Sequence, residues 1–125
     1  MVQPYPGDAP HRKLIVWRKA LDLVRTANDV AKAFPPDERY ELARQLRRAS
    51  RSVHANIVEG AGRRHRRDYA RFLAIARGSV REVTAHLEAI SVCNLLSGEA
   101  LEESERLADE VSRMLTAMLK RMDPL

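Results

Sequence analysis

The second half of the chain carries an unbroken heptad pattern, and this pattern limits the fold more than any other feature of the sequence. A spacing of three or four between apolar residues puts them on one face of an α-helix, whereas a half-buried strand needs strict alternation. We therefore predict one long helix that packs against others. The residues of the pattern are Tyr69, Leu73, Ala76, Val80, Val83, Leu87 and Ile90.

Three further segments show helical periodicity, and none of the 125 residues lies in a strand-like alternation. Pro35-Pro36 should end the first helix, and Asp37 should begin the second as an N-cap or first-turn acid. We expect helices at about 13–34, 37–59, 66–95 and 99–122. The apolar positions of the other three helices are Leu14, Trp17, Leu21, Val24, Ala27, Ala31 and Phe34; Leu42, Leu46, Ala49, Val53 and Ile57; and Leu101, Leu107, Ala108, Val111, Leu115, Met118 and Met122.

Four amphipathic helices joined by short turns predict an all-α fold, an antiparallel up-down-up-down four-helix bundle. The bundle should form a single domain over residues 12–125. Residues 1–11 contain three prolines and a glycine and are predicted to be a flexible tail.

Composition excludes several classes of protein. The apolar stretches are too short to span a membrane, and no secretory signal is visible. Cys93 is the only cysteine, so an internal disulfide is impossible and a cytoplasmic location is expected. We expect Cys93 to be a buried thiol.

Positive charge is concentrated in the middle of the chain. Residues 39–81 contain twelve basic residues, all arginine, and three acidic ones, whereas residues 82–125 contain four basic and nine acidic residues. Clustered charge of this kind produces a local potential that attracts an anionic partner. A solvated surface with no partner is the other interpretation.

Arginines are predicted to form one surface that points away from the core. At 100° per residue, four of them lie opposite the apolar face of the second helix, and the others continue through the following turn to the third helix. Guanidinium groups bind phosphate in a bidentate way, and stacking aromatics are scarce, so RNA or DNA backbone contacts are expected. The candidate residues are Arg44, Arg47, Arg48, Arg51, Arg63, Arg64, Arg66, Arg67 and Arg71.

The patterns required for catalysis or cofactor binding are missing from the sequence. The stretch GAGRRHRR lacks the Lys-Ser/Thr and the preceding strand of a phosphate-binding loop. No Glu-x-x-His occurs, and only Glu82 and His86 are spaced to share a metal, which is weak evidence for a di-metal site. We expect no enzyme, no cofactor and no metal. Asn56, Glu59, Gly60 and Gly62 are predicted to shape the turn between the second and third helices.

The third helix has additional residues beside its heptad stripe, namely Phe72, Ile75, Gly78 and Ser79. Glycine inside a helix costs about 1 kcal/mol relative to alanine, and a close backbone approach is one reason to accept that cost. These residues are predicted to form a subunit contact. A wide core face within one chain is the alternative.

The chain resembles a known family in three stretches, LIVWRKALDLV, FPPDERYELARQLRRASRSVHANIVEGAGR and RDYARFLAIARGSVREV. The family comprises small bacterial four-helix-bundle proteins encoded in intervening sequences of 23S rRNA genes, and it includes the accessory variability proteins of diversity-generating retroelements. The resemblance covers residues 13–122. Its most specific part is the ordered combination Glu38-Arg39, Gln45, Arg47-Arg48-Ala49, Asn56-Ile57, Glu59-Gly60, Gly62-Arg63, Phe72-Leu73 and Gly78-Ser79.

This resemblance implies a homopentamer without catalysis, and in the retroelement branch it implies binding to nucleic acid and to a reverse transcriptase. Two departures concern local structure, because the family usually has proline at His54 and a serine-like cap at His65. We therefore expect a homo-oligomeric, RNA- or DNA-binding bundle. The alternative is a scaffold that docks an acidic protein such as a reverse transcriptase.

Overall fold

The computed structural model describes residues 10–34 and 40–122. Most of the predicted N-terminal tail lies outside these residues, as do Pro35-Pro36 and Asp37. A short 3-10 helix, η1 (Pro10–Lys13), precedes four α-helices: α1 (Ile15–Lys32), α2 (Tyr40–Ala61), α3 (Arg66–Val92) and α4 (Gly98–Met122). The predicted all-α class is confirmed.

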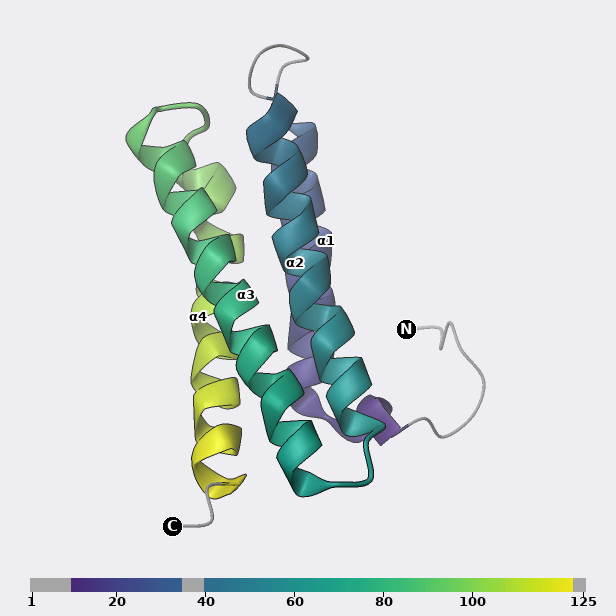
Figure 1. Cartoon of the computed structure of the whole chain (residues 1–125). Coiled ribbons are helices and arrows are strands. Elements are labelled where there is room, and N and C mark those ends of the chain that lie inside the picture. Colours follow the sequence, from purple (N-terminus) through teal and green to yellow (C-terminus); the bar gives the residue numbers. More distant parts are fainter. Residues whose placement is uncertain (1–9, 35–39, 123–125) are drawn as a thin grey trace.

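The four helices run alternately up and down (Figure 1). Helix α3 packs against α2 and α4, and α1 packs against the same two helices from the other side. The predicted four-helix bundle is therefore confirmed. At the lower end of Figure 1 the turn from α2 to α3 lies beside η1 and the end of α4.

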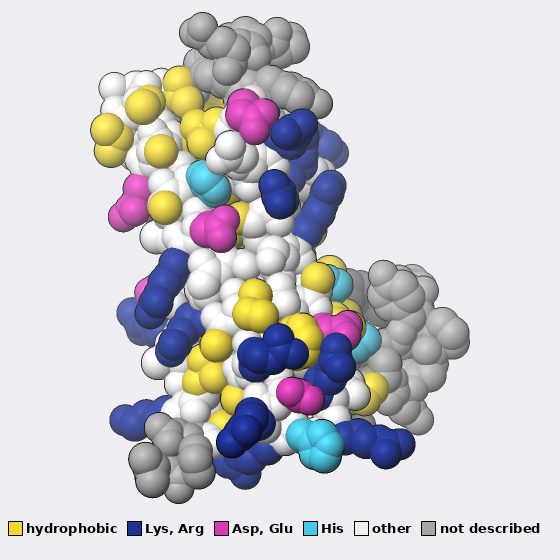
Figure 2. All heavy atoms as spheres, viewed as in Figure 1, with side chains coloured by type: hydrophobic (Ala, Val, Ile, Leu, Met, Phe, Trp, Pro, Cys, Tyr) yellow, Lys and Arg dark blue, Asp and Glu magenta, His cyan; other side chains and the backbone are white. Residues whose placement is uncertain are grey.

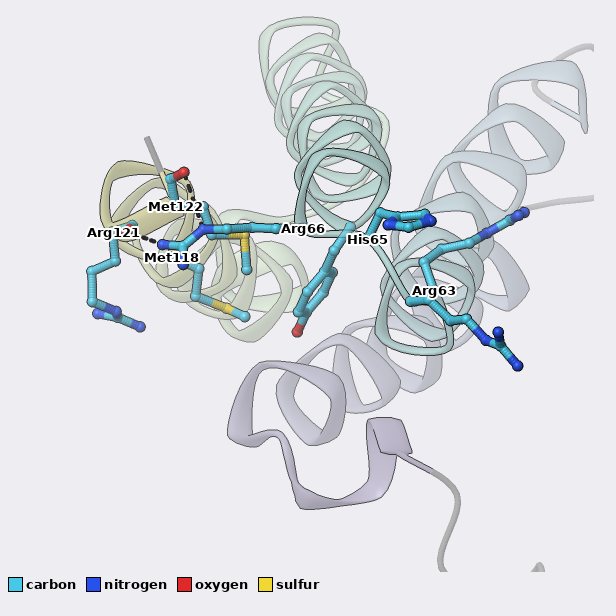
Figure 3. A pocket seen from close by; sticks show the side chains of 8 residues that line it. Arg63, His65, Arg66, Met118, Arg121 and Met122 are labelled. Atoms are coloured by element: carbon cyan, nitrogen blue, oxygen red, sulfur yellow. Dashed lines mark hydrogen bonds between the residues drawn. The ribbon is translucent and has the colours of Figure 1, made fainter. Parts of the chain in front are cut away.

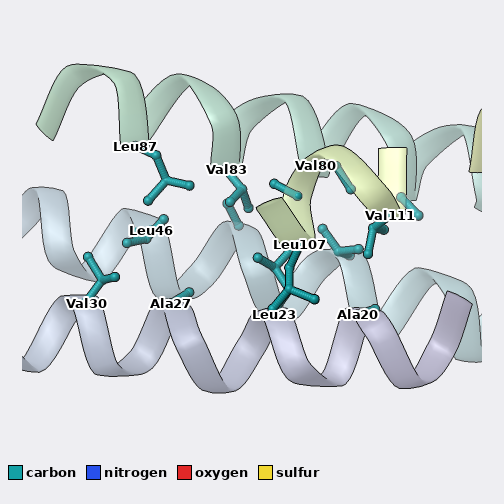
Figure 4. Packing of buried hydrophobic residues seen from close by; sticks show 14 of the residues in the cluster. Ala20, Leu23, Ala27, Val30, Leu46, Val80, Val83, Leu87, Leu107 and Val111 are labelled. Atoms are coloured by element: carbon teal, nitrogen blue, oxygen red, sulfur yellow. The ribbon is translucent and has the colours of Figure 1, made fainter. Parts of the chain in front are cut away.

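The apolar stripes of all four helices meet in one core (Figure 4). Every member of the α3 heptad from Leu73 to Ile90 is buried, as are Leu46, Val53 and Ile57 of α2. The core contains few aromatic side chains, so leucine, valine and alanine provide most of the packing between helices.

Helix α3 ends three residues earlier than predicted because Asn94 adopts a left-handed conformation with φ 55°. The Leu95 N–H donates to the Ile90 carbonyl at 3.1 Å, and the Asn94 N–H donates to Ser91 at 3.0 Å. These two bonds form a Schellman motif, which satisfies the last carbonyls of the helix. The expectation of a buried Cys93 is wrong: this residue is the C-cap of α3 and is exposed, because its side chain lies beyond the last turn that packs on the core.

The sequence GAG does not form the whole turn, because α2 continues through Gly60 to Ala61. Gly60 is buried, and a Cβ atom there would lie 3.0 Å from Phe72 Cβ, 3.0 Å from Tyr69 Cδ1 and 3.3 Å from the Tyr69 carbonyl oxygen. Gly60 therefore allows the first turns of α3 to approach α2 closely. The direction change itself falls on Gly62 and the residues that follow it, up to the start of α3.

A polar contact joins α1 to α2 near the lower end of the bundle. The indole Nε1–H of Trp17 donates to Nε2 of His54 at 3.0 Å, and the His11 ring lies edge-on to Trp17 with centroids 5.0 Å apart. His54 accepts this bond only as neutral imidazole with its proton on Nδ1. Helix α2 continues unbroken through His54, where the related family usually has proline.

Replacing Gly60 with alanine is expected to destabilise the fold by about 1–2 kcal/mol, because overpacking outweighs the gain in helix propensity. Chemical denaturation measures the free energy of unfolding. Gly98→Ala is the matched control, since a Cβ there meets nothing within 4 Å. A Gly60→Ala protein as stable as the control would show that α2 and α3 are not closely packed at this point.

The protein is expected to lose stability as the pH falls below about 6.5, the ordinary pKa of an unfolded histidine. Burial, and secondarily the charge of His11, lower the pKa of His54 in the folded state. Because the folded state resists protonation, the stabilising effect is complete above the unfolded pKa and is lost as the pH falls through the folded pKa. One such proton contributes a slope of up to about 1.4 kcal/mol per pH unit.

Denaturation followed by the fluorescence of Trp17, the only tryptophan, measures this slope between pH 7.5 and 5.5. His54→Gln retains an acceptor for the indole and should flatten the slope. His65→Gln, at an exposed position, is the control. An equal slope in the wild type and the His54→Gln variant would contradict the assignment.

Candidate nucleic-acid interface

Helix α2 has opposite faces of opposite character. Leu46, Ala49 and Val53 are buried, whereas Arg44, Arg48 and Arg51 are exposed and Arg47 is half-buried. This arrangement follows from the helical period, because the arginines occupy the positions farthest from the apolar stripe.

Two grooves flank the α2 arginines. The larger, of about 760 Å³, has all four of them along its α2 side, and Glu82 and His86 of α3 line it as well. The smaller, of about 250 Å³, lies towards α1, where Arg25 joins Arg47 and Arg51. Arg47 and Arg51 line both grooves.

Only one of the four arginines on the outer face of α2 forms an ion pair with a described residue. Arg44 lies 3.6 Å from Glu41, and both side chains are exposed, so this pair contributes little. Arg47, Arg48 and Arg51 make no ion pair with any residue in 10–34 or 40–122. These three guanidinium groups retain their donors for a ligand. We call Arg44, Arg47, Arg48 and Arg51 the α2 cluster.

Two of the predicted phosphate-binding arginines flank an aromatic ring instead. The guanidinium carbons of Arg63 and Arg71 each lie 4.7 Å from the centroid of the Phe72 ring. Arg63 also forms an ion pair with Glu59 at 2.7 Å. Cation–π contacts of this kind hold both guanidinium groups beside the Phe72 ring.

Arg66 crosses from the first turn of α3 to the C-terminal end of α4 (Figure 3). Its Nη2 donates to the Arg121 carbonyl at 2.7 Å and its Nε to the Met122 carbonyl at 3.3 Å. Carbonyls in the last turn of a helix lack helical partners and carry partial negative charge, so Arg66 caps α4. The neighbouring Arg64 and Arg67 are exposed and make no ion pair within the described ranges.

Figure 2 shows two concentrations of basic side chains on the α2/α3 face. One lies towards the upper right of the view and the other near the bottom. The band between them has few charges at its centre and right, and further basic side chains lie along its left edge. The sequence explains this gap on α2, since that helix has no arginine or lysine after Arg51. The predicted surface is therefore divided on this face.

The four residues predicted to form a subunit contact differ in their surroundings. Ile75 is 42% exposed, Phe72 is half-buried, and Gly78 is exposed with no atom within 4 Å of where a Cβ would stand. Ser79 is only 6% exposed, and its hydroxyl bonds that of Ser52 on α2 at 2.8 Å. A wide core face explains Ser79 but leaves Ile75 and Gly78 unexplained.

The predicted turn residues lie mostly within α2. The Asn56 amide nitrogen donates to the Ser52 carbonyl at 2.8 Å, and Glu59 pairs with Arg63 as described. Gly60 is the packing position against α3, and Gly62 lies in the turn. His65 is the N-cap of α3 but makes no side-chain capping bond, as its departure from the family pattern predicts.

Sequence reasoning missed a cavity of about 420 Å³ where the start of α3 meets the end of α4. Its lining includes Tyr69, Met118 and Met122, all of which the periodicity assigned to the core. The sequence did offer one indication of this cavity. Tyr69 is the first residue of its apolar stripe and Met118 and Met122 are the last of theirs, and residues at helix ends have fewer neighbours to cover them. Nothing in the sequence indicated that Arg66 and Arg121 would meet there.

Comparison with known proteins identifies the family. The model of the 23S rRNA-intervening sequence protein family matches residues 12–117. The chain belongs to this family. No match was found among curated proteins.

A similar solved structure is that of a protein with unknown function from the S23 ribosomal protein family of Bacteroides thetaiotaomicron VPI-5482, determined at 1.70 Å resolution. It is 25% identical in sequence and superposes with a TM-score of 0.77, covering 85% of this chain and 99% of its own. This similarity supports the bundle architecture.

The comparisons and the structure also bear on catalysis, metal binding and membrane insertion. Neither the family description nor that of the solved structure mentions a catalytic activity. Within the described residues no group of three or more His, Cys, Asp or Glu side chains is placed to hold a metal ion, and no helix is long and apolar enough to cross a membrane.

Proposed function

We propose that this protein is a non-enzymatic, homo-oligomeric bundle that binds the phosphate backbone of RNA or DNA. The observation that carries the proposal is the α2 cluster, in which Arg47, Arg48 and Arg51 line adjoining grooves with no ion pair in the described part of the chain. Arginine forks match phosphate oxygens, and the release of counterions makes such binding favourable. The family's link to 23S rRNA genes supports an RNA ligand.

Binding should depend on charge and shape rather than on base sequence. Among the residues that line the grooves beside the α2 cluster, the imidazole of His86 is the one aromatic ring, so few bases could stack there. Glu82 stands in the larger groove and would repel a phosphate placed near α3. The backbone is therefore expected to follow α2 rather than the floor of this groove. The single cysteine supports action in the cytoplasm.

The band with few charges on the α2/α3 face supports the oligomeric part of the proposal. Ile75 and Gly78 are exposed, and glycine inside a helix costs about 1 kcal/mol relative to alanine. A neighbouring subunit that packs on them would bury the Ile75 side chain and offset the cost of the glycine. The family resemblance implies five subunits.

A scaffold function is favoured by one specific observation, the contact of the Phe72 ring with both Arg63 and Arg71, whose guanidinium carbons each lie 4.7 Å from its centroid. Aromatic and arginine side chains are enriched in protein interfaces, so this spot suits an acidic protein partner such as a reverse transcriptase. Recovery of one protein partner by pull-down after nuclease treatment, together with no direct RNA binding, would favour this function over the first.

Replacing Arg47, Arg48 and Arg51 with glutamine is expected to weaken RNA binding for all sequences alike. The slope of log affinity against log salt should fall by up to about 2, because each lost phosphate contact removes about 0.7 from a single-strand slope. Fluorescence anisotropy of labelled single-stranded RNA and of a duplex, at several salt concentrations, measures both quantities.

The matched control changes the same number of charges on α4, at Arg106, Arg113 and Lys120, and should have a much smaller effect. Equal affinity of the α2 variant and the wild type would remove the α2 cluster from the binding site.

Replacing Gly78 with leucine is expected to dissociate the oligomer while leaving the monomer folded, since a side chain there meets no atom of its own chain. Sedimentation velocity gives the mass, and circular dichroism gives the helix content. Gly98→Leu is the control, because its Cβ position is equally open within the chain but lies at the far end of α3 and α4. A wild type that sediments as a monomer would refute the subunit contact.

A further inference from the structure

The cavity between the start of α3 and the end of α4 is separate from the α2 cluster. It has a volume of about 420 Å³ and lies at the end of the bundle. Figure 3 shows Arg63 and His65 on the side of the α2–α3 turn, Met118 and Met122 on the side of α4, and Arg66 crossing between them. Its lining combines positive charge with apolar surface.

Arg63 is paired with Glu59, but the other arginines of the lining are not neutralised. Arg66 is held by two carbonyl oxygens rather than by a carboxylate, so it is fixed in position and keeps its full charge. Arg64 and Arg121 are exposed and make no ion pair within residues 10–34 and 40–122. None of the residues that line the cavity is acidic. A ligand for this cavity should therefore carry negative charge.

The apolar part of the lining indicates that the anion has an organic portion. Tyr69, Met118 and Met122 are all partly buried and face the same cavity. The Tyr69 ring packs over Gly60, because a Cβ there would lie 3.0 Å from its Cδ1. The volume falls in the range of small-molecule sites, about 300–1,000 Å³, and exceeds what an inorganic phosphate needs.

Burial also raises the pKa of the Tyr69 hydroxyl. Like an ordinary tyrosine, the group is protonated at neutral pH and can donate a hydrogen bond. An aromatic ring with a donor, a thioether and several guanidinium groups provides a surface for a planar base beside donors for a phosphate.

We propose that this end cavity binds a single nucleotide, its phosphate held by Arg64, Arg66 and Arg121 and its base packed against Tyr69 and Met118. The choice of a nucleotide over other organic anions rests on the proposed function. Two sources present this chemistry, a free nucleoside monophosphate and the phosphorylated end of an RNA strand. If it holds a strand end, the cavity would fix the terminus of an RNA at this end of the bundle.

Isothermal titration of the intact protein with adenosine monophosphate tests the cavity directly. Arg64→Gln combined with Arg121→Gln should weaken binding about tenfold or more, since charge-assisted bonds to the phosphate are lost. Arg66 is left in place so that the cap of α4 is preserved. Met118→Glu, which puts a carboxylate into the cavity, should have a similar effect.

The matched control, Arg113→Gln with Lys120→Gln, and the α2 variant described above should both bind the nucleotide as the wild type does. Adenosine alone and inorganic phosphate alone should bind more weakly than the monophosphate. No binding of adenosine monophosphate, or binding that the cavity variants leave unchanged, would overturn the inference.

RNA oligonucleotides of one sequence, with and without a terminal phosphate, distinguish the two sources. A preference for the phosphorylated end that disappears in the Arg64/Arg121 variant assigns the cavity to RNA ends. Nucleotide binding in the cavity without such a preference assigns it to free nucleotides. The protein could bind RNA through the α2 cluster and yet bind no nucleotide. This result would support the proposed function and contradict only the inference of a nucleotide site.

Discussion

The close approach of α2 and α3 at Gly60 determines how the functional side chains are arranged. Tyr69 and Phe72 pack directly over this glycine, so the start of α3 is pressed against the last turns of α2. From there the two helices remain in contact, and the Ser52–Ser79 hydroxyl pair joins them near the middle. The cavity at the end of α3 depends on this packing, because Tyr69 lines it. A bulkier residue at position 60 would displace Tyr69 and Phe72.

The arginines of the middle segment have three different roles, although composition treats them as one group. Those of the α2 cluster, together with Arg64 and Arg67, are largely unpaired, Arg63 and Arg71 lie over the Phe72 ring, and Arg66 caps α4. Only the first role leaves the whole guanidinium fork available to a polyanion. Charge counts therefore overstate the size of a phosphate-binding surface when arginine also packs and caps.

Periodicity predicted most of the fold, because a bundle core depends on residue spacing, and the α3 stripe from Leu73 to Ile90 is buried as expected. Periodicity did not predict the ends of the helices correctly, because local backbone hydrogen bonds determine where a helix stops. The left-handed conformation of Asn94 ended α3 early and exposed Cys93, and α2 continued through Gly60. For the site, helical phase predicted that the α2 arginines face outward. The partners of Arg66 and the cavity beside Tyr69 depend on contacts between α3 and α4 that are far apart in sequence.

The division of the basic surface has a consequence for how a polyanion would bind. Eleven residues lie between Arg51 and Arg63, and the charged side chain among them is the acidic Glu59. A strand that follows α2 would cross this band without a basic partner on α2 for its phosphates. If Ile75 and Gly78 pack against a neighbouring subunit, the band is covered and basic groups from adjacent subunits border the same interface. Assembly would then multiply weak contacts with one nucleic acid, which raises avidity without any new residue. In the proposed assembly, oligomerisation and nucleic-acid binding would both use the α2/α3 face.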